Sequence, residues 1–185
     1  MVIARLVSGW GPYAIAAQKV GAQIESISWM TAGGFQGAIA AFVGQNYGAK
    51  KIDRIKHGFN IAIKLISGIG ILATVLLYFF SKEIFEFFIP EKETLFYGID
   101  YLKIVAYSQI FMCIELTTAG AFNGISKTLP PSIVSIIFNL LRIPMAILLI
   151  KIIGINGIWW AITISSILKG IILFGWFEKY YRKGF

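Results

Sequence analysis

The sequence contains very few of the side chains on which metal and redox chemistry depends. Its 185 residues include one cysteine, Cys113, and one histidine, His57, and the only aspartates are Asp53 and Asp100. A single thiol excludes an intrachain disulfide and a thiolate metal cluster. So little aspartate and histidine leaves few groups from which to build a metal-dependent or hydrolytic enzyme. We therefore expect no enzymatic activity and no metal site.

Charge is scarce as well. Only 14% of the residues are charged, 57% are hydrophobic, and the mean hydropathy is +0.75. Several apolar stretches exceed the roughly 18 to 20 residues that cross a hydrocarbon core. Residues 1–20 lack the basic start, compact apolar core and cleavage site of a secretory signal. The composition predicts an all-α integral membrane protein that spans the lipid bilayer several times.

The positive charge is concentrated at the ends of these stretches. A net charge of +8 would suggest nucleic acid in a soluble protein, but here the lysines and arginines serve to orient spans, so we expect no nucleic-acid partner. Alternate loops carry eight basic residues on one side and four on the other. Because cytoplasmic loops are the richer in lysine and arginine, we expect a multi-pass protein of the cell membrane with a cytoplasmic C-terminus.

The apolar runs and the turns between them predict five full spans. Residues 1–10 are too short to span, and the segment Ser8-Gly9-Trp10-Gly11-Pro12 is typical of a helix end. We therefore expect residues 1–10 to be the remnant of a preceding helix and residues 11–185 to form a five-helix bundle. The predicted spans cover residues 13–47, 59–80, 95–122, 132–150 and 157–177.

Small residues dominate the inner half of the first predicted span. Gly33, Gly37 and Ala41 recur every four residues, a spacing that lets another helix approach closely. The run ends at Gly44, Gln45 and Gly48, after which basic residues begin. We interpret these glycines and Gln45 as a structural motif and not as a binding site.

Several motifs occur together along the chain. They are Gly9 with Ala14-Ile15-Ala16-Ala17, Gln23-Ile24-Glu25-Ser26, Trp29-Met30, Val43-Gly44-Gln45-Asn46-Tyr47-Gly48-Ala49-Lys50, Thr118-Ala119-Gly120-Ala121-Phe122-Asn123-Gly124, Arg142-Ile143-Pro144 and Gly154-x-x-Gly157-Ile158-Trp159. Together these motifs resemble the C-terminal half of a multidrug and toxic compound extrusion (MATE) transporter. The resemblance covers essentially the whole chain; the stretch after the first span is specific in combination, whereas each piece alone is a weak signal.

The resemblance implies twelve helices in two six-helix lobes and export of drugs or organic cations in exchange for Na⁺ or H⁺. This chain would supply helices eight to twelve and the tail of helix seven, so a separate N-terminal lobe is an expected partner. Three alternatives stay open: a lipid-linked saccharide flippase of the same superfamily, a non-transporting truncated remnant, and a small membrane enzyme. The scarcity of aspartate and histidine argues against the last.

Glu115 is the main candidate for cation coupling. A carboxylate within a span is costly and marks an ion or proton pathway by default, and Thr118 lies on the same helical face. Arg142 would lie at similar depth in the next span, so we expect it to pair with Glu115, whereas the acid that Lys169 would need is not identified. The resemblance places the family's cation-linked acid one turn earlier, near Met112. A purely structural charge pair is the alternative.

Glu25 is the candidate for the substrate cavity. It lies in the polar outer half of the first span, where the resemblance places the central cavity between the lobes. A carboxylate there could attract an organic cation, with Trp29 as a cation–π surface. Gln18 and Gln23 would add hydrogen bonds, although a solvated glutamate among polar lining explains the same residues equally well.

Overall fold

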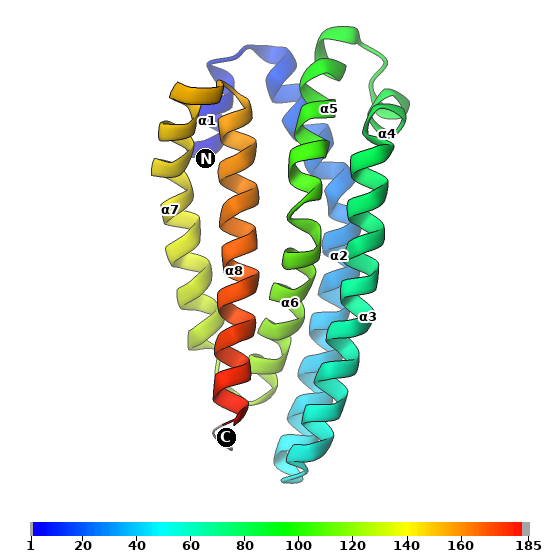
Figure 1. Ribbon diagram of the computed structural model, residues 1–185, viewed down its shortest axis with the longest axis vertical. Helices are drawn as coiled ribbons and strands as arrows, with labels where there is room; N and C mark the ends of the chain where they lie inside the picture. Colours follow the sequence, from blue (N-terminus) through cyan, green and yellow to red (C-terminus); the bar gives the residue numbers. More distant parts are fainter. Residues whose placement is uncertain (1, 183–185) are drawn as a thin grey trace.

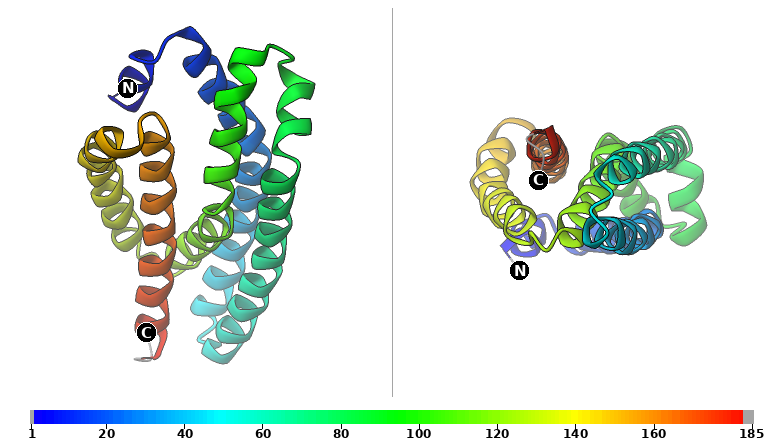
Figure 2. Two further views of the ribbon diagram at one scale, coloured as in Figure 1. Left: turned by 45° about the horizontal axis from the view of Figure 1, so that its top comes forward. Right: turned by 90° about the horizontal axis from the view of Figure 1, so that it is seen from below.

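The computed structural model describes residues 2–182 and is entirely α-helical over that range (Figure 1). Lys183, which we counted as a cytoplasmic basic residue, lies outside the described residues. Helices α2 to α8 pack into an elongated bundle (Figure 2), and the short α1 lies at one end of it, next to the N-terminus. The helices are α1 Val2–Ser8, α2 Pro12–Gly48, α3 Ile52–Phe79, α4 Ser81–Phe88, α5 Lys92–Ala106, α6 Gln109–Gly124, α7 Leu129–Ile153 and α8 Asn156–Arg182.

The expected membrane architecture is confirmed. By length and composition, α3, α7 and α8 can each cross a bilayer, and α5 together with α6 forms a fourth, bent candidate. The first predicted span, residues 13–47, corresponds to α2, whose 37 residues include the polar stretch around Glu25. Its crossing stays a prediction.

Two apolar clusters hold the ends of the bundle. One cluster contains Trp159 and Tyr101, and the other contains Phe59, Phe122 and Phe177. In the second cluster, the rings of Phe59 and Phe177 lie 4.6 Å apart between centroids. Along α8, the polar residues of the bundle interior fall between the two clusters.

The connections between helices are shorter than we predicted. Helix α3 already begins at Ile52, so Arg54 and Lys56 lie on a helix and not in a loop. Helix α4 occupies much of the predicted loop 81–94. Its Phe85 is buried against Gly98 of α5, which explains why this short amphipathic segment folds back on the bundle.

The third predicted span is broken. Helices α5 and α6 meet at an angle of 53°, whereas the continuous apolar run predicted one helix. A break inside a membrane leaves carbonyl groups that need donors, because lipid supplies none. Three hydroxyl groups lie within hydrogen-bond distance of the carbonyls that precede the break: Thr163 Oγ1 to Ile104 O at 3.1 Å, Ser108 Oγ to Val105 O at 2.8 Å and Thr74 Oγ1 to Ala106 O at 3.0 Å. The Thr74 hydroxyl shares its proton with the carbonyl of Gly70 in its own helix, at 2.9 Å.

Thr163→Val should therefore destabilise the fold by about 1–3 kcal/mol, the usual result of leaving a buried carbonyl without its donor. The measurement is thermal unfolding of the purified protein in detergent. Thr31→Val is the matched control, because the exposed Thr31 hydroxyl bonds only the carbonyl of Ile27 in its own helix. Equal melting temperatures for the two variants would contradict this role of Thr163.

Two glycines of α6 allow a close contact between α6 and α2. A Cβ atom on Gly120 would overlap the backbone carbonyl of Gln36 on α2, and one on Gly124 would lie 2.7 Å from Ala40 O. The spacing of four residues puts both glycines on one face, so the backbones of α2 and α6 can approach.

The predicted close packing at Gly33 and Gly37 is wrong within the described chain. No heavy atom outside their immediate helical surroundings lies within 4 Å of a Cβ built on either residue. The buried face of α2 is instead formed by Ala32, Ile39 and Val43, which lie roughly 120° around the helix from the two glycines. Of the other motif residues, Gly44 faces Gly124, whose carbonyl oxygen would lie 3.3 Å from a Cβ atom built on Gly44, whereas Gln45 and Gly48 are exposed.

Candidate functional site

Four charged side chains lie within the bundle. Glu25 on α2, Glu115 on α6 and Lys169 on α8 are only 9%, 8% and 5% exposed, and Arg142 on α7 is half-buried. Ionisable groups inside membrane-spanning bundles are costly and generally pair or serve a transport path. Together these four residues form a polar interior with two positive and two negative side chains.

Glu115 pairs with Lys169. The Lys169 ammonium nitrogen lies 3.1 Å from Glu115 Oε1, which identifies the acid that the sequence could not name for Lys169. The predicted pairing of Glu115 with Arg142 is wrong, because Arg142 Nε instead donates a hydrogen bond to Ser165 Oγ at 2.8 Å. The reason is packing order: α8 packs along both α6 and α7, whereas α6 and α7 barely touch.

Glu25 lies where the bent span breaks. Its carboxylate accepts hydrogen bonds from the Tyr101 hydroxyl and from Gln109 Nε2, the latter at 3.4 Å. Gln109 is the first residue of α6, and Tyr101 is on α5. The edge of the Tyr101 ring contacts Trp159 with centroids 4.8 Å apart, which orients the phenol towards Glu25.

The two buried carboxylates differ in their counter-charges. Within residues 2–182, Glu25 has no basic nitrogen within 4.0 Å, whereas Glu115 has the Lys169 ammonium. Arg142 interacts electrostatically with both carboxylates from a greater distance. The Oε1 atom of Gln109 is also buried without a hydrogen-bond partner. Glu25 and the Gln109 amide therefore offer oxygen atoms to which a proton or a small cation could bind.

The residues expected around a substrate cavity do not form one group. Glu25 faces the bundle interior, whereas Gln23 is exposed on another face of α2 and Gln18 is half-buried. Trp29 is 45% exposed, so it is available to a partner or substrate, but the Glu25 carboxylate points away from such a molecule.

Thr118 lies on the same helix as Glu115 and close to it, where the sequence led us to expect it. It is fully buried on α6, one turn after Glu115, and its hydroxyl has no hydrogen-bond partner among the described residues. Thr117 is buried in the same way. Both hydroxyl groups can serve as oxygen ligands only if an ion or a water molecule reaches this depth.

Sequence reasoning missed Tyr101, Gln109 and Ser165. Tyr101 and Gln109 are eight residues apart, about two helical turns, and polar side chains at that spacing in an apolar run indicate one shared face. Ser165 carried no such signal, because Ser166 beside it is equally polar and only the packing of α7 against α8 selects between them.

The motifs and the helical arrangement agree with the comparison to known proteins. The sequence profile of the MatE family matches residues 1–148, four fifths of the chain. The chain belongs to the MatE family. It is therefore a transporter-family protein and not an enzyme.

Among curated relatives of this MatE chain are the probable multidrug resistance protein YoeA of Bacillus subtilis and the probable multidrug resistance protein NorM of Thermotoga maritima. Each is 26% identical, over 99% and 88% of the chain respectively. The crystal structure of the Vibrio cholerae MATE transporter VcmN in the bent form superposes with a TM-score of 0.89 at 22% identity, over 97% of the chain. That structure shows the same fold.

The chain spans about two fifths of these proteins. It covers 40% and 36% of the two curated relatives and 41% of the VcmN chain. The matched length corresponds to the half-transporter that the sequence motifs predicted.

Proposed function

We propose that the chain forms one lobe of a cation-coupled antiporter that exports drugs or organic cations across the cell membrane. A second lobe of the same architecture would complete the transport path. Family membership and the multidrug resistance relatives support this function. The single observation that carries it is Glu25, a buried carboxylate that accepts hydrogen bonds from two helices and has no basic partner within 4.0 Å among the residues that the structure describes.

The chemistry of Glu25 suits either coupling ion. As a carboxylate, Glu25 accepts hydrogen bonds from Tyr101 and Gln109. Binding of H⁺ or Na⁺ neutralises its charge and weakens its attraction for both donors, so ion occupancy changes the forces between α2 and the bent span. Alternating access then follows from rigid-body motion of this lobe against the other.

Glu115 is the second proposed coupling residue, and Thr118 is a proposed ligand beside it. A cation that reaches Glu115 must displace the Lys169 ammonium, because that group already lies 3.1 Å from its carboxylate. Arg142 is the resident positive charge that acts on both carboxylates. The substrate would contact the exposed outer half of α2, at Gln23 and Trp29.

Glu25→Gln is expected to reduce gradient-driven efflux at least tenfold while the protein still accumulates in the membrane. The amide keeps the shape and accepts hydrogen bonds, but it carries no negative charge, so it cannot exchange a proton and holds Na⁺ much more weakly than the carboxylate does. Efflux of a fluorescent organic cation is measured in vesicles containing the assembled transporter under imposed Na⁺ and H⁺ gradients. The exposed Glu83→Gln on α4 is the matched control, and wild-type efflux in Glu25→Gln would remove Glu25 from coupling.

One observation favours the alternative of a flippase for lipid-linked saccharides. Because Glu25 faces inwards, the exposed outer half of α2 carries Lys19 and Gln23 and no exposed acid. A cationic face suits a pyrophosphate group better than an organic cation. Movement of a fluorescent lipid-linked saccharide without an ion gradient would support this alternative, and its absence in the same vesicles would exclude it.

A further inference from the structure

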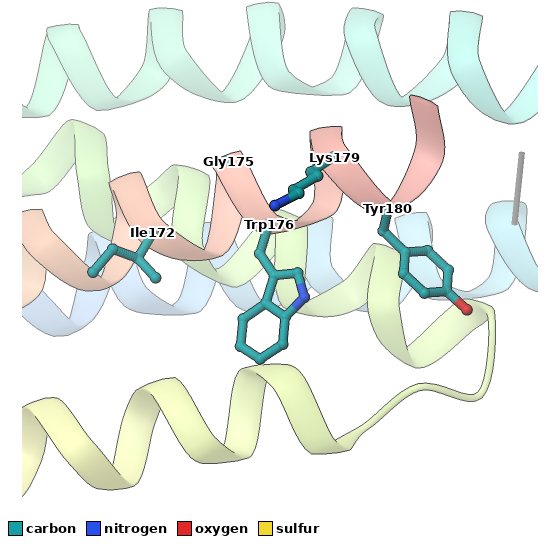
Figure 3. Close-up of a pocket in the computed structure, with 5 residues that line it drawn as sticks. All are labelled: Ile172, Gly175, Trp176, Lys179 and Tyr180. Atoms are coloured by element: carbon teal, nitrogen blue, oxygen red, sulfur yellow. The ribbon is translucent and has the colours of Figure 1, made fainter. Parts of the chain in front are cut away.

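A groove at the C-terminal end of α8 matches one class of ligand. This α8 groove encloses about 450 Å³ and is lined by Ile172, Gly175, Trp176, Lys179 and Tyr180 (Figure 3). We propose that it binds an anionic glycerophospholipid, with an acyl chain along Ile172 and Gly175 and the phosphate at Lys179. The site is separate from the polar interior and does not depend on the transport function.

The shape of the groove suits an acyl chain. Ile172 and Trp176 remain 40% and 39% exposed, and no heavy atom lies within 4 Å of a Cβ built on Gly175. The absent side chain of Gly175 leaves a notch between two large apolar walls. Because the lining residues stand at positions i, i+3, i+4, i+7 and i+8 on one helical face, the groove runs along the helix for roughly 12 Å at 1.5 Å per residue.

The charge at one end of the groove suits a phosphate. Figure 3 shows the Lys179 side chain lying back along α8, with its nitrogen above Trp176. The neighbouring cavity of about 330 Å³ contains Glu178 and Arg182 as well as Lys179 and Gly175. Arg182 Nε lies 3.5 Å from Glu178 Oε2, so that acid already has a basic partner. In the described part of the chain, Lys179 forms no ion pair, and its ammonium is available to an anion.

The location indicates a lipid as the source of that anion. Helix α8 is apolar and long enough to cross a bilayer, and the groove opens on its exposed face. Trp176 and Tyr180 are the aromatic residues that favour the membrane interface. A second basic residue lies at this end of the bundle, since Lys56 of α3 lies 4.9 Å from the ring centre of Tyr181. Basic residues at a membrane surface attract anionic lipids in particular.

The test measures lipid binding to the purified chain in detergent micelles by native mass spectrometry. Phosphatidylglycerol is the probe, phosphatidylcholine is the zwitterionic competitor, and inorganic phosphate is the soluble competitor. Lys179→Gln should weaken phosphatidylglycerol binding about fivefold, the effect of one basic residue at an anionic surface. Lys179→Arg should bind as wild type, and Gly175→Leu, which fills the notch, should weaken binding of both lipids.

Lys82→Gln on α4 is the control, because it removes an exposed lysine at the opposite end of the bundle. Retained helicity and monodispersity of Gly175→Leu would show that its loss of lipid is local. Unchanged phosphatidylglycerol binding in either Lys179→Gln or Gly175→Leu would overturn the proposal. Equal affinity for the two lipids would overturn it too, and displacement by millimolar inorganic phosphate would assign the site to a free anion.

Discussion

Lys169→Met alone should destabilise the bundle by about 3–5 kcal/mol, because it would leave the Glu115 carboxylate buried without its partner. The double variant Lys169→Met/Glu115→Leu should recover most of that loss. Replacing both members of a buried pair by apolar groups is often neutral or stabilising, and a lipid environment favours apolar residues further. The measurement is the thermal unfolding of each variant in detergent.

Lys103→Met provides the matched control, since Lys103 is exposed on α5 and forms no ion pair within the described residues. A single variant as stable as this control would contradict a buried charge pair. If the double variant were less stable than Lys169→Met, the two residues would act independently. The same double variant tests function: retained coupling without either charge would leave Glu25 as the coupling acid.

Gly120→Leu should prevent α2 and α6 from packing and reduce stability by more than about 3 kcal/mol, at the upper end of overpacking effects. The added side chain would meet the backbone of Gln36, which cannot move aside as a flexible side chain can. We expect the variant to yield little monodisperse protein in detergent.

Gly37→Leu is the informative comparison, because it adds the same side chain to the other helix of this pair. Among residues 2–182, no heavy atom outside its immediate helical surroundings lies within 4 Å of a Cβ built on Gly37, so this variant should fold and give wild-type yields when the chain is produced alone. Its effect should appear only when a second lobe covers that face of α2. If Gly37→Leu failed and Gly120→Leu folded, the assignment of the close contact to α6 would be wrong.

These glycines show how far sequence reasoning reached and where it stopped. Small residues that recur every four positions mark a helix face that another helix can approach closely. Both Gly33 with Gly37 and Gly120 with Gly124 have this spacing. Which of the two faces is covered depends on how α2 is rotated about its axis, which no local pattern records. The fold class and the helix order were predictable because hydropathy and turn residues determine them locally, and the family was predictable from the resemblance of the motifs.

The buried charged residues also separate what the local sequence predicts from what only the packing of the helices determines. The sequence predicted that Glu115 and Arg142 lie at similar depth in the membrane on neighbouring spans, and this similar depth suggested an ion pair. The pairing failed because α8 packs against both helices and supplies Lys169 and Ser165. For Glu25, the polar outer half of α2 was recognisable, but the inward orientation of its carboxylate depends on Tyr101 and Gln109, more than 75 residues away in the sequence.

The hydroxyl groups at the break constrain how the lobe can deform. Straightening α5 and α6 into one helix would return Ile104 and Ala106 carbonyls to helical partners and release the threonines of α8 and α3 that now bond them. Two helices on different sides of the span would have to give up their bonds in the same step. The bend between α5 and α6 is thus rigid. A force applied to either helix should tilt the whole lobe and leave the angle between α5 and α6 unchanged.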